Sequence, residues 1–496
     1  MSLLFWDGFS HYATADVIKK WTTQNAAIIN VGSGRRGGNS LRSTGGTAHY
    51  VSKTIPATTN FVIGFAYMTS LISAGTGPKV VELFDSATTQ CDLRVNGDGT
   101  LSVTRNGTVL TGGTSSFAIS AGAYYFIEWK VTIADSIAAN SCKVRVNGVD
   151  WITVAAGQDT KNTANATANV VNFGTMNSFS GVPATDFADF YLCDQSGTTN
   201  NDFLGDIRVD TLYPNADGTY SQWNYSGLSG AHRYWRVNIA ENNTSTTVAI
   251  GELILRTVSG GANVATGGTA SASTTFSGQL SSLAFDANNS TYWNGTSSFN
   301  GTTGLLTGAE EWLKYDLGPG NDKAIIEFAI TCAGNIFQAP RAFKLQYSDD
   351  GVNWANLIAV TNQSGWALGQ TRSFTYSAPA ATHYNNVDES IPDAYDYNYA
   401  LTPGLRDSYA FQDLPSLVSP VVYGVQINAA MLKDDAGNKQ VAPFVRSGGT
   451  DSDGPDKALG TTQAYVSQIW ETNPSGAVPW TQATVNAAEF GVKVSV

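Results

Sequence analysis

Apolar residues recur at every second position along much of the chain, and this pattern limits what the chain can fold into. It is clear in residues 61–67 and again in residues 125–133. Successive side chains of a β-strand point to opposite faces, so each segment is predicted to be a strand with one buried face. In the second segment we expect Glu128, Lys130 and Thr132 to face solvent. The pattern predicts an all-β protein.

Asn-Gly pairs separate several of these alternating runs, at residues 96–97, 106–107 and 147–148. Both residue types tolerate the positive φ angles that a tight β-hairpin requires. We therefore expect neighbouring strands to pair antiparallel, and residues 1–212 to form one antiparallel β-sandwich.

The order of strands and hairpins in this region resembles that of a concanavalin/laminin-G-like domain. The resemblance rests on LRVNGDGTLSVTRNGTVL (93–110), on CKVRVNGVDWITV (142–154) and on the closing strand DFADFYLCD (186–194). It implies a jelly-roll sandwich for the first part of the chain. No group of residues within it marks a ligand site of its own.

Charge and hydropathy exclude several classes of function. Only 14% of the residues are charged, against roughly 25% in typical globular proteins, and the net charge is −12. A negative protein repels phosphate backbones, so nucleic acid is not an expected partner. The chain lacks an apolar run long enough for a membrane-spanning helix, so membrane insertion is not expected. Its N-terminus, MSLLFWDGFSHY, lacks the basic start of a secretory signal.

The four cysteines show no metal-binding spacing. They stand at positions 91, 142, 193 and 332, without a CxxC pair and without a nearby histidine. We expect free, buried thiols. This favours synthesis in a reducing cytosol, or assembly there into a particle that is later released.

A second region, from about residue 232 to 380, contains five motifs of one known family. They are RYWRVNI (233–239), GELILR (251–256), SSLAFDANNSTYWNG (281–295), EWLKYDLG (311–318) and AFKLQYSDDGVNW (342–354). The segment resembles a discoidin domain, the coagulation-factor type C module, close to family-32-type carbohydrate-binding modules. In most discoidin domains the RYWR and GEL strands come last, so their position here implies a circular permutation.

The segments on both sides of this module resemble a single domain. VDTLYPNADGTYSQWNYSG (209–227) and THYNNVDESIPD (382–393) are similar to neighbouring segments of the C-terminal β-domain of many phage virion proteins. In those proteins this domain follows the laminin-G-like part. Further strands are predicted within 424–449 and 480–496.

We therefore predict tandem antiparallel β-sandwiches with one domain inserted into another. The first domain spans residues 1–212, and a discontinuous C-terminal β-domain comprises 213–230 and 382–496. The discoidin-like carbohydrate-binding module occupies 231–381. Loop tips whose ends lie close together tolerate such insertions.

The discoidin resemblance also implies a structural calcium ion in the loop AFDANNSTYW. Calcium takes six to eight oxygen ligands in flexible geometry, which a mixture of carboxylate, amide, hydroxyl and carbonyl groups supplies. The resemblance assigns Asp286, Asn288 or Asn289, and Thr291 as ligands, with Glu252 of GELILR completing the site.

This loop departs from the family pattern at two positions. The family often has Gly where Ala287 stands and a second Asp where Asn288 stands. One carboxylate fewer weakens the affinity for calcium. The alternative is an Asx-turn without an ion, in which Asp286 accepts hydrogen bonds from backbone N–H groups.

Aromatic rings in polar loops mark a possible carbohydrate site in the same module. Sugar-binding proteins stack an aromatic face on the C–H side of a sugar ring and add a few polar groups for its hydroxyls. The alternative is that these rings fold back onto their own sandwich. The residues expected to bind a ligand are Phe276, Phe299, Phe337, Arg341 and Trp366.

No catalytic residues are expected. The chain contains no HExxH motif and no GxSxG nucleophile elbow, and its acidic clusters are typical of solvated turns. The sequence thus favours a phage virion structural protein, assembled in the host cytoplasm, that binds host-surface glycan through the discoidin-like module. The alternative is a purely structural capsid or tail decoration protein. In either case we expect other virion proteins as partners and a homo-oligomer.

Overall fold

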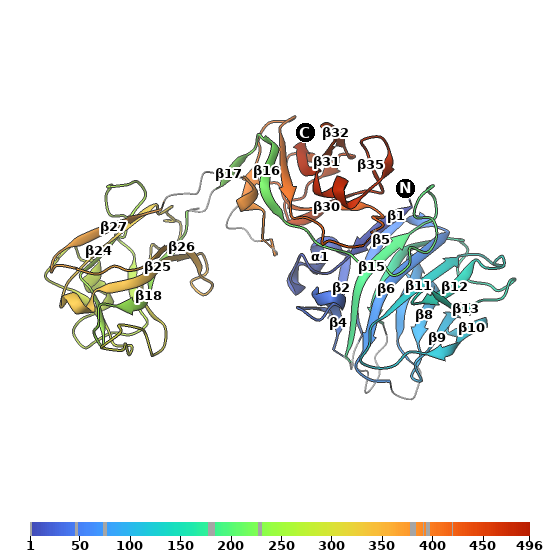
Figure 1. The fold of residues 1–496 in the computed structure, drawn as a ribbon, viewed down its shortest axis with the longest axis horizontal. Coiled ribbons are helices and arrows are strands. Elements are labelled where there is room, and N and C mark those ends of the chain that lie inside the picture. Colours follow the sequence, from blue (N-terminus) through green and yellow to red (C-terminus); the bar gives the residue numbers. More distant parts are fainter. Residues whose placement is uncertain are drawn as a thin grey trace. The chain divides into compact units, whose positions relative to one another are not determined.

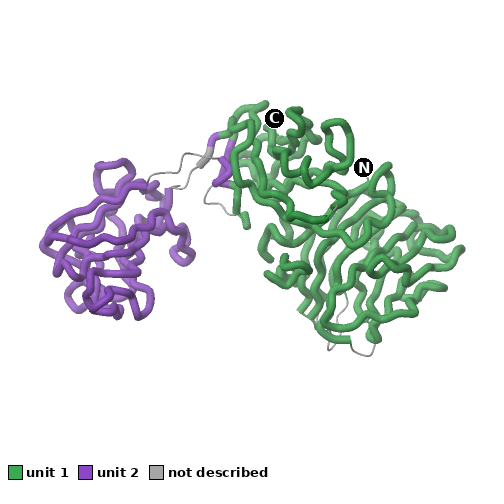
Figure 2. The backbone as a smooth tube through the Cα atoms, viewed as in Figure 1, with its two compact units in different colours: residues 1–223, 387–393, 400–496 green, residues 224–386, 394–399 purple. Residues whose placement is uncertain are grey.

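The chain divides into two compact units (Figure 2). Unit 1 comprises residues 1–223, 387–393 and 400–496, and unit 2 comprises residues 224–386 and 394–399. The computed structural model describes residues 2–44, 48–72, 77–176, 184–226, 231–376, 383–389, 391–392, 397–418 and 420–496. Its sheets pair antiparallel, which confirms the all-β prediction.

The first part of unit 1 is a sandwich of two large sheets (Figure 1). One sheet has the order β13-β12-β11-β6-β15-β4-β3, with β1 also paired to β15, and the other has the order β10-β9-β8-β7-β14-β5-β2. The strands of the first sheet are β1 (Leu3–Asp7), β3 (Ile28–Asn30), β4 (Ser40–Ser43), β6 (Asn60–Thr69), β11 (Tyr125–Thr132), β12 (Cys142–Val146), β13 (Val149–Thr153) and β15 (Thr185–Cys193). Those of the second are β2 (Thr23–Asn25), β5 (His49–Thr58), β7 (Lys79–Asp85), β8 (Thr88–Val95), β9 (Thr100–Arg105), β10 (Thr108–Ala118) and β14 (Ala168–Thr175). Short helical turns are η1 (Thr14–Asp16), α1 (Val17–Lys20) and η2 (Arg35–Gly37).

The first sheet is buried on both faces at its centre, which the alternation did not predict. The expected inward residues of β6 and β11 do fill the core between the sheets. Glu128, however, is also buried, and its carboxylate accepts hydrogen bonds from the Tyr191 hydroxyl (2.6 Å) and the Gly205 N–H (2.8 Å). The segment that contains Leu204 and Ile207 packs over this outer face. The prediction that Glu128 faces solvent was therefore wrong.

Two of the three Asn-Gly pairs form the tight hairpins that we expected. Asn106 and Gly107 join β9 to β10, and Asn147 and Gly148 join β12 to β13, with positive φ at all four residues. The third pair lies in a longer turn between β8 and β9, where the positive φ belongs to Gly99.

The C-terminal part of unit 1 is a smaller β-domain that packs on the first sandwich. Its main sheet has the order β16-β29-β37-β31-β32, with β33 also paired to β31. Ile469 joins the cluster over the outer face of the first sheet, and the Glu471 carboxylate accepts from the backbone N–H of Ser2 at 2.9 Å. The elements are β16 (Pro214–Ser221), β29 (Arg406–Phe411), β30 (Val425–Met431), β31 (Gln440–Ser447), β32 (Thr450–Asp453), β33 (Lys457–Ala458), β34 (Ala464–Trp470), β35 (Thr472–Asn473), β36 (Val478–Pro479), α2 (Gln482–Asn486) and β37 (Glu489–Val494).

Segments on the two sides of unit 2 pair with each other. In unit 1, β16 pairs with β29, with Asp217 opposite Tyr409. In unit 2, β17 (Asn224–Ser226) pairs with β28 (Tyr397–Tyr399), next to η5 (His383–Asn386). The chain thus leaves the C-terminal β-domain and returns to it at neighbouring strands. The boundaries predicted at residues 230 and 381 lie outside the described residues.

Unit 2 contains a sandwich with its own core. A sheet of order β21-β23-β18-β25-β26 faces a sheet of order β20-β24-β27, and β19 pairs with β22. Strand β18, the first strand of this sandwich in chain order, lies at the centre of the first sheet. The strands are β18 (Tyr234–Asn242), β19 (Val248–Ile250), β20 (Glu252–Arg256), β21 (Thr269–Ala272), β22 (Trp293–Gly295), β23 (Glu311–Asp316), β24 (Glu327–Thr331), β25 (Pro340–Ser348), β26 (Ala355–Val360) and β27 (Thr371–Thr375).

Four tryptophans lie in the strand motifs of this module, and two of them are in its core. Trp235 and Trp293 are fully buried. Trp312 and Trp354 instead lie outside the core, on the two sides of the Arg236 guanidinium, whose carbon is 5.9 Å and 4.3 Å from their ring centroids. Trp312 follows an inward residue of β23, so the alternation of the strand turns it outward.

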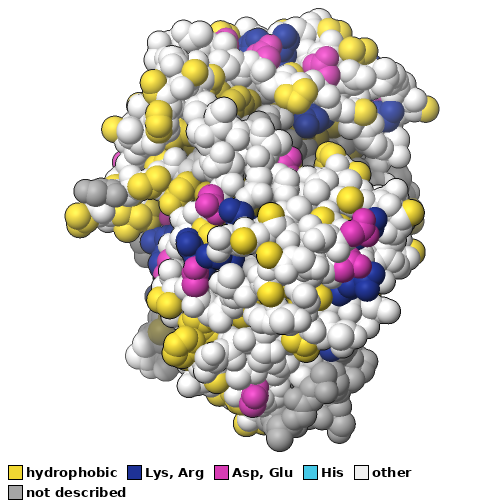
Figure 3. All heavy atoms as spheres, turned by 90° about the vertical axis from the view of Figure 1, so that its right-hand side faces the viewer, with side chains coloured by type: hydrophobic (Ala, Val, Ile, Leu, Met, Phe, Trp, Pro, Cys, Tyr) yellow, Lys and Arg dark blue, Asp and Glu magenta, His cyan; other side chains and the backbone are white. Residues whose placement is uncertain are grey.

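Thiols and surface charge agree with the composition. The four cysteines are free and buried, as predicted. On the face shown in Figure 3, charged side chains are sparse and Lys and Arg lie beside Asp and Glu. Within the described residues, no helix combines the length and hydrophobicity that crossing a bilayer takes.

A buried ion pair anchors the N-terminal strand of unit 1. Asp7 accepts hydrogen bonds from the Phe9 N–H (2.9 Å), the Trp21 indole N–H (2.7 Å) and the Tyr12 hydroxyl, and Lys20 Nζ lies 3.4 Å from its carboxylate. Burial opposes the charge on Asp7, but Lys20 and these donors outweigh it and lower the pKa of Asp7. Both side chains are almost completely buried.

We expect Asp7→Ala to destabilise unit 1 by roughly 3–5 kcal/mol, because it leaves Lys20 buried without its counter-charge. Asp150, whose ion pairs with Lys143 and Arg145 are exposed, provides the matched control. Asp150→Ala should cost less than about 1 kcal/mol. Urea unfolding of the two variants measures the difference, and equal losses would contradict the role given to Asp7.

Candidate functional site

The strand registers of unit 2 bring the predicted site loops to one end of its sandwich. Asn242, the last residue of β18, pairs with Pro340, the first residue of β25. Ile239 pairs with Glu311 at the start of β23. The loops that precede β23 and β25 therefore meet the loop that follows β18. We call this the distal end of the module.

The chain enters and leaves the module at the opposite end. His232 forms a β-bridge with Lys323, and Tyr234 at the start of β18 pairs with Asp316 at the end of β23. Tyr376, just after β27, donates its N–H to the Ile326 carbonyl. The loops of the distal end are thus not the ones through which the module is attached.

A buried carboxylate that the sequence analysis missed organises the distal end. Glu311 is fully buried and accepts hydrogen bonds from the hydroxyls of Ser273 and Thr274 and from the Ser297 N–H (2.8 Å). A Cβ at Gly295 would lie 2.6 Å from its carboxyl carbon, so only glycine fits there. The alternation in EWLKYD contained the signal, because Glu311 is in phase with the inward residue Leu313.

The residues predicted to bind calcium come together at this end. Thr291 Oγ1 donates to the Asp286 carboxylate (2.8 Å), and the Asn288 N–H donates to both Asp286 (2.9 Å) and Glu252 (2.9 Å). Ala287 has a φ of 59°, the left-handed conformation for which the family often uses glycine. The loop thus contains the Asx-turn that the alternative interpretation requires, and it also places Glu252 against that turn.

Two carboxyl groups share this small space. Burial raises the pKa of Glu252 to about 7, and its hydrogen bond and charge interaction with Asp286 act in the same direction. Within the described chain, no cluster of three or more His, Cys, Asp or Glu side chains could hold a metal ion. Two carboxylates with neighbouring hydroxyl, amide and carbonyl oxygens nevertheless form a donor set that fits a hard divalent cation such as calcium.

Phe276 and Phe337 lie in neighbouring loops of the distal end, and each is 52% exposed. Tyr292 connects the two loops, because its hydroxyl accepts from Gln279 Nε2 at 2.5 Å and its ring packs against Gly334. Gly334 has a φ of 71°, and a Cβ there would lie 3.2 Å from the Tyr292 ring. Both phenyl rings were predicted as ligand contacts, and both are accessible.

Phe299 and Trp366 cannot offer a ring face to a ligand, so their predicted role is corrected. Phe299 is 4% exposed and Trp366 5% exposed, and both belong to the core of the module. The Trp366 indole N–H donates to the carbonyls of Pro340 and Gln363, and the Arg372 guanidinium stacks on its ring at 4.3 Å. Both rings fold back onto their own sandwich.

Arg341 has a different role from the one predicted. Its Nε donates to the Glu241 carboxylate at 2.8 Å, and its Nη2 donates to the Thr303 carbonyl at 2.5 Å. The guanidinium therefore ties the loop around Thr303 to strands β18 and β25. It positions the distal end instead of extending freely toward a ligand.

The distal end also exposes apolar side chains beyond the two phenylalanines. Exposed aliphatic side chains do not stabilise a fold, because an apolar side chain contributes to stability only when it is buried. The exposed aliphatic residues of the distal end are Leu280, Leu305, Ile336 and Leu368.

Comparison with protein families supports the assignment of this module. Residues 269–384 match the F5/8 type C domain. Residues 269–384 are an F5/8 type C domain. Strands β18 and β20 precede the matched residues and yet complete the two sheets of the F5/8 type C domain. A domain of this family suggests carbohydrate as a binding partner.

Comparison with solved structures adds only weak likenesses. Cellulose induced protein Cip1 is 18% identical with a TM-score of 0.28, over 38% of this chain and 96% of that chain. Alginate lyase Aly36B is 11% identical with a TM-score of 0.28, over 38% and 95%. A heptameric SAP-like pentraxin from Limulus polyphemus is 14% identical with a TM-score of 0.22, over 30% and 74%. Such values carry no inference about activity. No curated protein matches the chain.

The raised pKa of Glu252 predicts a pH dependence in metal-free protein. Between about pH 4.5 and 7 the folded state holds a proton that the unfolded state has lost, so stability falls as pH rises through this window. Glu252→Gln should remove this loss and be more stable than the wild type at pH 8, by on the order of 2 kcal/mol. Urea unfolding in EDTA at pH 5, 6, 7 and 8 checks this, and parallel curves for the two proteins would contradict it.

Proposed function

We propose that the protein is a non-enzymatic structural component on the surface of a phage particle and binds host-surface glycan through its F5/8 type C domain. The observation that carries the binding part is the pair of half-exposed rings, Phe276 and Phe337, in polar loops of the distal end. An exposed aromatic face beside polar groups is the arrangement that stacks on a sugar ring. The hydrogen bond from Gln279 Nε2 to the Tyr292 hydroxyl holds the loop of Phe276 in place.

The attachment of the module supports this proposal. Within the described residues, the first and last strands of the module begin and end opposite the distal end, away from Phe276 and Phe337. The phage origin rests on different support, namely the similarity of residues 209–227 and 382–393 to the C-terminal β-domain of virion proteins. We also propose that the protein forms a homo-oligomer with other virion proteins as neighbours.

We propose further that a calcium ion stabilises the loop beneath this surface. Glu252, Asp286, Asn288 and Thr291 would hold it, since the Asn288 N–H and the Thr291 hydroxyl bring these four residues together through hydrogen bonds to the two carboxylates. The ion would supply the positive charge that two adjacent carboxyl groups lack. With two carboxylates, we expect affinity at the weak end of the range, roughly 0.1–1 mM as in extracellular modules.

Glycan binding should depend on the exposed rings. We expect the intact protein to bind at least one glycan on an array of bacterial surface polysaccharides. Phe276→Ala and Phe337→Ala should each weaken that binding about tenfold, because each removes an apolar stacking face worth roughly 1 kcal/mol or more. Titration of the bound glycan by calorimetry measures the change.

Two controls separate binding from folding. Phe117 of unit 1 is 57% exposed, so Phe117→Ala matches the loss of an exposed ring without touching the module. Phe299→Ala should instead destabilise the module by roughly 3–5 kcal/mol, because it opens a cavity in the core. Silence across the array, or unchanged affinity in both ring variants, would favour the purely structural alternative.

Calcium at 10 mM should stabilise the module by about 1.4–2.7 kcal/mol for a dissociation constant of roughly 0.1–1 mM. Glu252→Gln should abolish this increment, whereas Asp322→Asn at the opposite end should keep it, because Asp322 is exposed and far from the loop in the strand order. Urea unfolding with calcium or EDTA at pH 8 measures the increment. Equal increments in both variants would rule out this site.

A further inference from the structure

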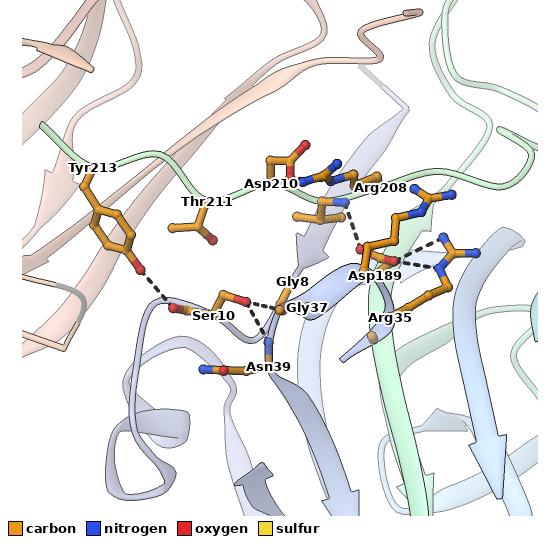
Figure 4. Close-up of a pocket in the computed structure, with 14 residues that line it drawn as sticks. Gly8, Ser10, Arg35, Gly37, Asn39, Asp189, Arg208, Asp210, Thr211 and Tyr213 are labelled. Carbon is orange, nitrogen blue, oxygen red and sulfur yellow. Dashed lines mark hydrogen bonds and ion pairs between the residues drawn. The ribbon is translucent and has the colours of Figure 1, made fainter. Parts of the chain in front are cut away.

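A polar pocket in unit 1 is separate from the F5/8 type C domain. It has a volume of about 250 Å³, equal to the liquid volume of roughly eight water molecules. Figure 4 shows Thr211 and Tyr213 on one side of it and Ser10 and Asn39 on the other, with Arg35, Asp189 and Arg208 at the third side. Its walls come from the N-terminal segment, η2, the middle of β15 and the segment that leads to β16.

Two wall residues have a backbone conformation that their side chains disfavour. Arg36 has a φ of 67° and Asp189 a φ of 50°. The pairing of β15 with β6 is irregular between Ala188 and Tyr191, so Asp189 lies at a bulge. Left-handed conformations of this kind cost on the order of 1 kcal/mol each, and bulges re-aim side chains beside sites. Both outliers lie in the wall of the same pocket.

The contacts of Arg35 hold its side chain in place and fix one wall of the pocket. Arg35 Nε lies 3.2 Å from Asp189, and its two terminal nitrogens contact the Ile207 carbonyl (2.5 Å) and Asp206 (2.5 Å). Asp189 also accepts from the Val209 N–H at 2.9 Å. Arg35 and Asp189 therefore form a rigid back wall.

The other two arginines keep free donor capacity. Arg36 makes one long contact, 3.4 Å to Asp206, and its side chain is 40% exposed. Arg208 contacts Asp210 through Nε alone at 2.5 Å within the described residues. The lining carries three arginines and two aspartates, and Asp206 outside the lining pairs with Arg35 and Arg36. The group is therefore neutral as a whole, and what the pocket offers an anion is the unused N–H donors of Arg36 and Arg208.

We propose that this pocket binds an acidic monosaccharide unit, with its carboxylate at Arg36 and Arg208 and its hydroxyls toward Asn39 and Thr211. The volume exceeds what a lone inorganic anion needs and suits one sugar ring. Tyr213 supplies an aromatic wall whose hydroxyl is held by the Ser10 carbonyl at 2.9 Å. Guanidinium groups pair with carboxylates through charge-assisted hydrogen bonds, which gives the charged sugar its advantage over a neutral one.

D-glucuronate and D-glucose serve as probes, titrated into the full-length protein by calorimetry. We expect glucuronate to bind at least about tenfold more tightly than glucose, since one charge-assisted contact distinguishes them. Arg36→Gly should weaken glucuronate binding by a similar factor without lowering the melting temperature, because glycine adopts the φ of 67° at no steric cost. Thr211→Val should weaken both sugars.

Controls match each part of the Arg36→Gly change. Asn140 is an exposed residue with a φ of 66°, so Asn140→Gly relieves the same backbone conformation without changing the charge. Arg105→Gln removes one exposed arginine elsewhere in unit 1. Both controls, and Phe337→Ala in the F5/8 type C domain, should bind glucuronate as the wild type does. Equal affinity for the two sugars, absence of glucuronate binding, or wild-type binding by Arg36→Gly would overturn the proposal.

Discussion

The pairing of β16 with β29 is the constraint on which the organisation of the chain depends. These strands come from opposite sides of the F5/8 type C domain, and their pairing closes the C-terminal β-domain across the insertion. The sheet continues into β37, the last strand of the chain. The inserted module has a hydrophobic core of its own.

Buried carboxylates organise the chain at each level of this architecture. Asp7 anchors the first strand through Lys20 and three hydrogen-bond donors, and Glu128 holds the covering segment through Tyr191 and Gly205. Glu311 ties two loops of the distal end together. In each case several donors offset at least part of the cost of burying a charge, which makes the local geometry specific.

The position of the candidate site could be predicted, but its working surface could be predicted only in part. The family resemblance predicted that Glu252 and Asp286 belong to one site, and the structure places them in contact. For the ring residues, the polar character of a loop did not distinguish the exposed Phe337 from the buried Phe299. That difference depends on how each loop folds over the sheet ends, which has no periodic signal. The pocket of unit 1 was not predictable, because its walls come from segments far apart in the chain.

Local periodicity was enough to establish the β-strands, two tight hairpins and the inward residues of β6 and β11, because a strand repeats every two residues whatever surrounds it. The five motifs were enough to identify the F5/8 type C domain. Long-range packing decided that the outer face of the first sheet is buried at Glu128. It also decided that outward-facing tryptophans contact Arg236. Such packing joins residues that no short window of sequence contains, so it emerges only when the sheets come together.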